Sequence, residues 1–232
     1  MSRKILVVSA HIGDEILGCG GTLARHMRMG DAVRVIVLGE GWTSRTKSLQ
    51  KGLEALDLDA FEEQAHRALG ALAVTDVRFH RLPDNRSDQI PLLDIVKLIK
   101  QHKADYRPDQ IYTSTPIDLG VDQRTACQAV LTAFRPLPGE VYSELLAFEV
   151  RSSTEWAGGF TGDVFQPQCF VDISKTMEAK LGALRVLETE VRPWPHSRSI
   201  EAVMQHARAR GASVGVAAAE AFSVLRSIRR AA

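Results

Sequence analysis

Apolar and polar residues alternate in blocks along the chain, and the length of each block separates expected strands from expected helices. Residues 4–10 form a nearly continuous apolar run, typical of a parallel strand covered on both faces. Residues 15–29 instead carry apolar side chains such as Ile16 and Leu23 at helical spacing, and the run stops at Gly30. The same reasoning predicts strands at residues 33–38, 77–80, 110–114, 141–148 and 165–173, and helices at residues 49–72, 90–102, 122–134, 174–190, 199–209 and 216–229.

This order of elements predicts the class of fold. Strands that alternate with helices of about 12 or more residues indicate βαβ units, hence a mostly parallel sheet with helices on both faces. No repeat, low-complexity tract or linker interrupts the 232 residues, a length that suits one core. We therefore predict a single three-layer, Rossmann-like α/β domain over residues 1–232, with Ser174 capping the helix that follows it.

Charge and composition exclude several classes of partner. A net charge of +1 and a pI near 7.8 give no field that would attract nucleic acid or an anionic membrane. No apolar stretch approaches the length of about 20 residues that spans a membrane, and the first apolar run is short for a signal peptide. The three cysteines, Cys19, Cys127 and Cys169, are odd in number and far apart, which indicates a reducing compartment. We expect a cytoplasmic protein.

Candidate chemistry lies where the first strand passes into the first helix, in the stretch SAHIGDEI at residues 9–16. Ligands bind at the carboxyl ends of strands in such folds. His11 would emerge from the strand end and Asp14 from the first helical turn, so together they could hold two corners of a zinc site. The simpler interpretation is a local hydrogen bond by His11 and a helix cap by Asp14. The following GCGG lacks the GxGxxG spacing, so a dinucleotide fingerprint is not supported.

The sequence SAHIGDEILGCGGTLARH resembles the N-terminal signature of the PIG-L/LmbE-type N-acetylglucosaminyl deacetylases, usually written (A/P)HPDDE followed by LGCGGT. The resemblance continues in order through nearly the whole chain. It implies an LmbE-like fold, metal-assisted amide hydrolysis and an amino-sugar context. The later stretches that carry it are LGEGWTSR (38–45), TPIDLGVDQRTACQAV (115–130), FEVRSSTEW (148–156), FQPQCFVDISKTMEAK (165–180), RPWPHSRSIEA (192–202) and ARARGASVGVAAAEAF (207–222).

In this family two His and one Asp bind zinc, the adjacent Asp of HPDDE is the general base, and a His of an HxxH-type element assists the reaction. By resemblance His11 and Asp14 match two zinc ligands, whereas Gly13 stands at the general-base position. Gly120 stands at the first His of the second motif and Gln123 at the remaining zinc ligand. Glycine cannot accept a proton, and an amide oxygen is a poor zinc donor beside imidazole or carboxylate.

The leading hypothesis is therefore a catalytically impaired homologue that binds an amino-sugar derivative or a partner, with no intact catalytic residue. Glu15 is not expected to substitute for the base, because one helical step rotates a side chain by about 100°. No cofactor is expected to bind tightly, and zinc would bind only if a residue such as His80 or His196 rebuilt the site. An active N-deacetylase with a rebuilt or metal-independent site is the second hypothesis. A non-enzymatic subunit of an assembly is the third, and a homo-oligomer is possible.

Four residues are candidates for substrate binding. Arg45 matches the family's substrate-binding arginine, Asp122 is retained from the second metal motif, and Arg151 and His196 lie in later signatures. An exposed loop, a surface salt bridge and local hydrogen bonds are the competing explanations for Arg45, Arg151 and His196. Further candidates for the rim are Glu149, Glu155, Trp42, Trp156 and Trp194. The remaining histidines, His26, His66, His102 and His206, are expected at the surface or at the ends of helices.

Overall fold

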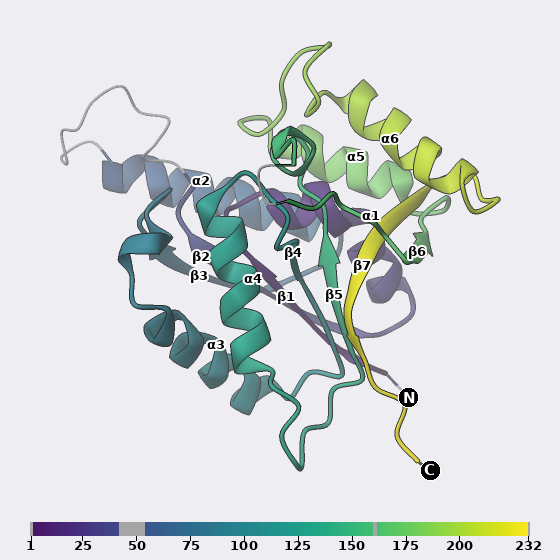
Figure 1. Cartoon of the computed structure of the whole chain (residues 1–232). Coiled ribbons are helices and arrows are strands. Elements are labelled where there is room, and N and C mark those ends of the chain that lie inside the picture. The colour runs from purple at the N-terminus through teal and green to yellow at the C-terminus, as the bar shows by residue number, and fades with distance from the viewer. Residues whose placement is uncertain (1, 42–53, 160–161, 232) are drawn as a thin grey trace.

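The computed structural model describes residues 2–41, 54–159 and 162–231, in which a seven-stranded sheet lies between two layers of helices (Figure 1). The strands follow the order β3-β2-β1-β4-β5-β7-β6 across the sheet. The first five are parallel to one another, and β7 is antiparallel to both of its neighbours. The strands are β1 (Lys4–Ser9), β2 (Ala32–Gly39), β3 (Asp76–Leu82), β4 (Gln110–Ser114), β5 (Glu144–Phe148), β6 (Cys169–Asp172) and β7 (Ala219–Ser227).

Helices cover both faces of the sheet, and alternate residues of the central strand β1 point to each. Ile5 and Val7 pack into the core beneath one helical layer, whereas Leu6 and Val8 pack into the core beneath the other. The predicted single α/β domain with a mostly parallel sheet is thereby confirmed. One layer contains α1 (Asp14–Arg28), α2 (Glu54–Gly70), α5 (Met177–Val186) and α6 (Ile200–Ala212), and the other contains α3 (Leu92–Tyr106) and α4 (Val121–Ala133).

The glycine-rich segment of α1, residues 18–21, packs closely against the sheet and contains a kink. A Cβ on Gly18 would lie 2.2 Å from a ring atom of Phe148, so only glycine lets the helix approach the sheet here. The helix departs from helical geometry at Cys19 (φ −141°), which frees backbone groups on both sides of the kink. Side chains of α5 and β7 provide hydrogen-bond partners for these groups.

A buried ion pair provides hydrogen-bond partners for the backbone groups that the kink frees. Glu220, on β7, accepts hydrogen bonds from the backbone amides of Gly21 (2.9 Å) and Thr22 (2.7 Å). Lys180, on α5, donates to the carbonyl of Leu17 (2.7 Å) and lies 2.6 Å from Glu220. Both side chains are only 4 % exposed. Through them, α5 and β7 stabilise the kinked form of α1.

The structure corrects two expectations about secondary structure. Residues 216–229 were expected to form a helix, but residues 219–227 form strand β7, which pairs with β5 and β6. Ser174 does not cap the helix after it, because α5 begins at Met177 and the Ser174 hydroxyl donates to Asp172 instead. The first part of the helix expected over residues 49–72 lies outside the described residues. Among the helices that are described, none combines the length and the apolarity needed to cross a bilayer.

Candidate functional site

His11 and Asp14 lie at the carboxyl end of β1, in the centre of the sheet. Chain connections leave this point in opposite directions, since β2 and β3 lie on one side and β4 and β5 on the other. Such a switch point is where α/β sheets bind ligands. Gly13 precedes α1 with a φ of 95°, a left-handed conformation that glycine adopts without strain.

Two carboxylates converge on the outer nitrogen of the His11 ring. Nε2 of His11 lies 2.7 Å from Oδ2 of Asp122 and 3.2 Å from Oδ1 of Asp84. Asp122 comes from the first turn of α4, and Asp84 follows β3. Both carboxylates are almost fully buried, and the His11 side chain is 12 % exposed. Together these three residues form a group that could hold a metal ion.

Backbone amides fix the position of Asp122. Its two oxygens accept hydrogen bonds from the amides of Asn85 (2.7 Å) and Ser87 (3.0 Å). Burial raises the pKa of Asp122, but the hydrogen bonds from His11 and Ser87 outweigh burial and the pKa is lowered. Burial likewise lowers the pKa of His11, but the bond to Asp122 and the charges of Asp14, Asp84 and Asp122 reverse this and the pKa is raised.

The inner side of His11 faces Gln123 instead of a carboxylate. Nε2 of Gln123 lies 3.3 Å from Nδ1 of His11 and donates to Oδ2 of Asp14 over 2.9 Å. The same Asp14 oxygen accepts from the backbone amide of His11 (3.2 Å). When Nδ1 accepts from this amide, the neutral ring carries its proton on Nε2, which points at Asp84 and Asp122. We call His11, Asp14, Asp84, Asp122 and Gln123 the His11 site.

The side-chain atoms around His11 and Asp14 show whether zinc could bind at the position that the family resemblance implies. His11, Asp14 and residue 123 would be the ligands there, but an amide N–H group faces both retained ligand atoms. An N–H donor cannot coordinate a cation, and it satisfies the acceptors that a metal would need. The residues present therefore do not fit zinc at that position. The separate group of His11, Asp84 and Asp122 offers three ligand atoms, and its contribution from His11 is Nε2 instead of Nδ1.

Neighbouring side chains fill the space beside the two unexpected glycines. An ideal Cβ on Gly120 would lie 1.9 Å from Oε1 of Gln123, so the Gln123 amide occupies the place of a side chain at position 120. A Cβ on Gly13 would lie 2.8 Å from Cγ of Glu190. Gly120 has a φ of −69°, which any residue adopts, so space and not backbone geometry requires glycine there.

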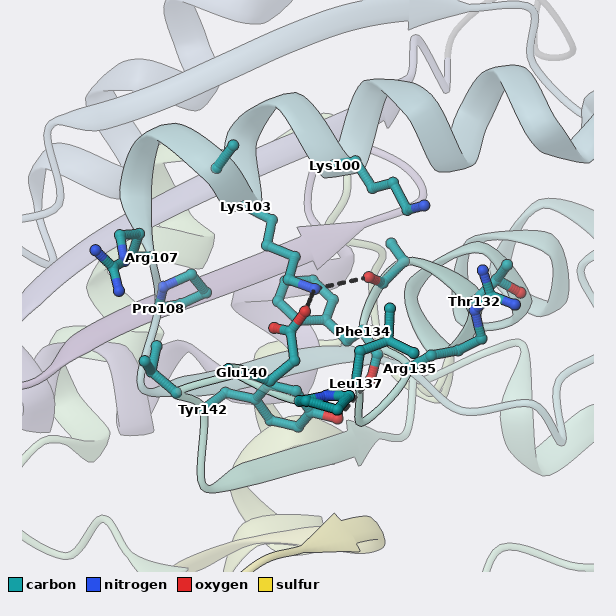
Figure 2. A pocket seen from close by; sticks show the side chains of 15 residues that line it. Lys100, Lys103, Arg107, Pro108, Thr132, Phe134, Arg135, Leu137, Glu140 and Tyr142 are labelled. Carbon is teal, nitrogen blue, oxygen red and sulfur yellow. Dashed lines mark hydrogen bonds and ion pairs between the residues drawn. The ribbon is translucent and has the colours of Figure 1, made fainter.

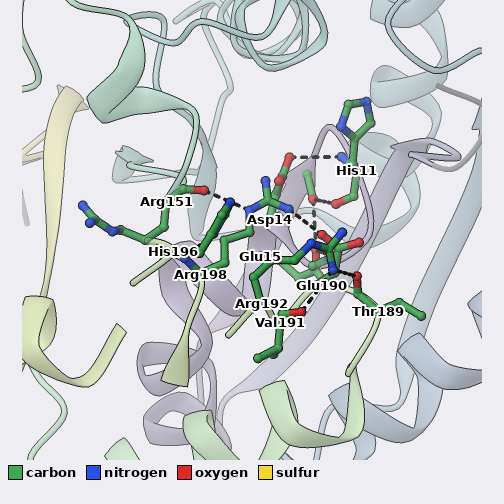
Figure 3. Close-up of polar contacts among 12 residues, drawn as sticks. His11, Asp14, Glu15, Arg151, Thr189, Glu190, Val191, Arg192, His196 and Arg198 are labelled. Atoms are coloured by element: carbon green, nitrogen blue, oxygen red, sulfur yellow. Dashed lines mark hydrogen bonds and ion pairs between the residues drawn. The ribbon is translucent and has the colours of Figure 1, made fainter. Parts of the chain in front are cut away.

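A buried ion pair from the C-terminal region covers Gly13. Glu190 is 1 % exposed in its side chain and lies 2.5 Å from Nη1 of Arg198. The Nε of Arg198 donates to the carbonyl oxygen of Arg151 (3.1 Å), and its backbone amide donates to Nδ1 of His196. Figure 3 shows this cluster beside Asp14. Burial raises the pKa of Asp14, although the charges of His11 and Arg198 oppose the rise.

Glu15 and Asp118 are buried carboxyl groups with local partners. Glu15 accepts from the Ser9 hydroxyl (3.0 Å) and the Gly13 amide (3.1 Å), and burial raises its pKa to about 7. Asp118 accepts hydrogen bonds from the hydroxyls of Ser153 and Thr154. Burial raises the pKa of Asp118 as well. Each of these carboxyl groups is bonded to the loops that shape the His11 site.

The remaining candidates are dispersed. Arg45 and Trp42 lie outside the described residues. Arg151 pairs with Glu155 (3.4 Å), and the His196 ring contacts the exposed Trp156 with centroids 5.7 Å apart. The other candidates have these contacts: His80 faces His102 with 2.8 Å between their Nε2 atoms, Glu149 pairs with His206 and Arg210, and Trp194 is 58 % exposed.

One histidine corrects an expectation, and three site residues were missed. His26 was expected at the surface or at a helix end; it does lie in the last turn of α1, but it is 2 % exposed, between Asp31 and Tyr112. Asp84, Glu190 and Arg198 were not singled out from the sequence. Asp84 lies four residues after the third expected strand, and the rule that ligands bind at the carboxyl ends of parallel strands could have found it. No comparable signal marks Glu190 or Arg198, which reach the site through the fold.

Comparisons with known proteins agree with this architecture. The family model described as PIG-L, GlcNAc-PI de-N-acetylase, matches residues 6–134. The chain therefore belongs to the PIG-L deacetylase family. It is 28 % identical over 189 residues to the uncharacterized deacetylase YaiS of Escherichia coli K12, which covers 79 % of this chain and 89 % of that relative.

Solved structures share the fold at lower identity. The N,N'-diacetylchitobiose deacetylase of Pyrococcus horikoshii superposes with a TM-score of 0.75 and 20 % identity, covering 97 % of this chain and 84 % of that one. GalB of Pseudomonas putida KT2440, a 4-carboxy-2-hydroxymuconate hydratase, gives a TM-score of 0.72 and 22 % identity over 99 % of this chain and its own full length. The fold thus accompanies more than one reaction, so the site must decide the function.

Proposed function

We propose that this chain is a PIG-L-family protein that binds an amino-sugar derivative at the His11 site and lacks the family's zinc-dependent amide hydrolysis. The observation that carries the proposal is the Gln123 amide, whose Nε2 lies 3.3 Å from Nδ1 of His11 and 2.9 Å from Oδ2 of Asp14. A protein N–H donor stands where the resemblance places a metal bond. The acceptors are then satisfied without any cation.

The surroundings of the His11 site suit a sugar derivative. Buried carboxylates accept hydrogen bonds from hydroxyl or amine groups, and the Arg198 guanidinium donates them. Arg198 is 17 % exposed in its side chain, so it can reach a ligand without leaving Glu190. Trp156 and Trp194 are more than half exposed and offer apolar faces for a sugar ring. In the family, deacetylases of amino sugars supply the precedent for such a ligand.

A direct test measures binding and metal content on the same protein. We expect glucosamine or N-acetylglucosamine to raise the thermal unfolding midpoint, because a ligand that binds only the folded state stabilises it. Glucose, which lacks the nitrogen, is the control sugar. Zinc measured after purification without a chelator should be far below one ion per chain. A protein that binds none of these sugars would contradict the proposed ligand.

A second candidate function rests on a specific observation, the convergence of His11, Asp84 and Asp122 on one point. These residues could hold a metal that supports hydrolysis of an N-acyl amino sugar from a position displaced from the family's own. Stoichiometric zinc that is lost in Asp84→Asn but retained in Gln123→Ala would favour this function over the first. Zinc that depends on Asp14 and not on Asp84 would contradict both candidates.

A further inference from the structure

A cavity lies at the opposite end of the parallel strands from the His11 site. It has a volume of about 440 Å³ and opens between the end of α3 and the loop that joins α4 to β5 (Figure 2). The cavity lies beside the N-terminal ends of β4 and β5, whereas the His11 site lies at the C-terminal ends of β1 and β4. Anything that binds here would not contact the His11 site.

The floor of the cavity consists of two aromatic rings and an ion pair whose charges cancel. Phe134 and Tyr142 are buried side chains whose rings meet edge to face, with centroids 5.6 Å apart. Lys103 lies 5.1 Å above the Phe134 ring and ends 2.5 Å from Oε1 of Glu140. It also donates to the carbonyl of Ala133 (3.0 Å). The one carboxylate among the described lining residues is therefore already paired.

Two arginines near the C-terminus hold the wall of the cavity in place. Nη1 of Arg226 donates to the carbonyl of Phe134 (2.6 Å) and to the hydroxyl of Tyr142 (2.7 Å). Arg230 donates to the carbonyls of Glu140 and Tyr142, each over 2.8 Å. The wall is tied to β7 and the segment after it, so it is organised before any ligand arrives.

The rim carries three exposed cations that have no protein partner among the described residues: Lys100, Arg107 and Arg135. Lys100 lies on α3 and Arg107 directly follows that helix, and both line the cavity. In a chain with a net charge of +1, this is a local surplus of positive charge beside an apolar floor.

We propose that this cavity binds a phosphorylated organic molecule of nucleotide size. The volume falls within the range of about 300–1,000 Å³ that is usual for small-molecule sites. Guanidinium and ammonium groups at the rim match phosphate oxygens by charge and hydrogen bonding. Leu137 and Val141, which are exposed and line the cavity, provide the apolar surface that the rest of the ligand contacts. The combination selects a ligand that is charged at one end and flat or apolar at the other.

Isothermal titration of the full chain tests the proposal with three probes: ADP, adenosine and pyrophosphate. We expect ADP to bind at least about tenfold more tightly than either of the others, since only ADP engages both rim and floor. The double variant Lys100→Ala/Arg135→Ala should weaken ADP binding by about tenfold or more. Added salt should weaken it too, because the rim charges are exposed.

The matched control removes two arginines elsewhere. Arg185 and Arg208 are exposed on α5 and α6, so Arg185→Ala/Arg208→Ala keeps the same change of net charge and should leave ADP affinity unchanged. If the rim double variant unfolds, Arg135→Ala alone serves as the test. The proposal is overturned if adenosine or pyrophosphate binds as tightly as ADP, if ADP does not bind, or if the rim variant binds ADP like the parent.

Discussion

Glu190 occupies the space that a side chain at position 13 would fill, since its Cγ would lie 2.8 Å from a Cβ built on Gly13. The same relationship joins Gln123 to Gly120, where the corresponding distance to Oε1 is 1.9 Å. At both positions where the resemblance places a catalytic side chain, a polar neighbour has taken the volume. The site is a closed hydrogen-bonded cluster, so a side chain introduced at position 13 or 120 alone would collide with its neighbour.

We predict that Gly13→Ala lowers the free energy of unfolding by about 1–3 kcal/mol, because it combines backbone strain with overpacking. Position 13 has a φ of 95°, and its Cβ would meet Glu190. Gly215→Ala is the matched control, because Gly215 has a φ of 77° and no atom within 4 Å of its Cβ. Urea unfolding measures both. Equal losses in the two variants would mean that contact with Glu190 contributes nothing.

Gly120→Ala should destabilise the protein by a different route. The backbone at Gly120 tolerates alanine, so the whole effect arises from displacing the Gln123 amide and its bond to Asp14. We expect a loss of about 1–3 kcal/mol in the parent and a much smaller loss in a Gln123→Ala background. A double-mutant cycle measured by chemical denaturation gives the coupling. Additive losses would contradict the packing of Gln123 against Gly120.

Gln123→His is expected to create a zinc site. Imidazole at this position would replace an N–H donor by a coordinating nitrogen beside His11 and Asp14, which completes three protein ligands. Zinc affinity, measured by competition with a chromogenic chelator, should rise by about tenfold or more over the parent. Gln123→Ala separates the new ligand from the mere loss of the amide. A histidine variant that binds zinc no better than the alanine variant would contradict the prediction.

The acid limb of the stability curve should depend on Glu149. Burial raises the pKa of this carboxyl, but the bonds to His206 and Arg210 outweigh it and lower the pKa from 4.5 to about 2. A lowered folded pKa stabilises the protein above pH 4.5 and ceases to do so as the pH falls to about 2. Glu149→Gln should therefore cost about 2–3 kcal/mol at neutral pH and little near pH 2. Urea midpoints across this range measure the difference, and a constant difference would argue against the pair.

The buried pair Lys180–Glu220 should be costly to break from one side only. Glu220→Gln leaves the Lys180 ammonium buried without its carboxylate, for which we expect a loss of about 3–5 kcal/mol. Lys180→Met/Glu220→Gln removes both charges, and the amide oxygen can still accept from Gly21 or Thr22. We therefore expect the double variant to be more stable than the sum of the single variants implies. Thermal and chemical unfolding give the comparison.

The fold could be predicted from sequence where a buried strand forms a short apolar run rich in β-branched residues. The run before His11 is almost entirely apolar because β1 is covered on both sides, and residues 110–114 match β4 in full. The helix expected over residues 216–229 failed because alanine-rich sequence has a high helix propensity, which pairing with β5 and β6 overrides. The local pattern of apolar and polar residues does not indicate that this segment pairs with strands distant in sequence.

The candidate site was predictable only in the part that is local in sequence. His11, Asp14 and Asp122 stand in short motifs at strand ends, and the structure brings them together. The roles of Glu190 and Arg198 depend on a loop more than 170 residues from Gly13, folded back over it. Whether a substituted position is empty or filled is a question of packing. Spacing along the chain does not contain the answer.

The kinked first helix has a consequence for the order in which the chain can fold. Its freed amides at Gly21 and Thr22 bind a carboxylate that the ribosome adds about 200 residues later, at Glu220. Until that strand emerges, the glycine-rich turn beside His11 has no partner for these donors. The native geometry of the His11 site is therefore completed only after the segment that contains Glu220 has been synthesised.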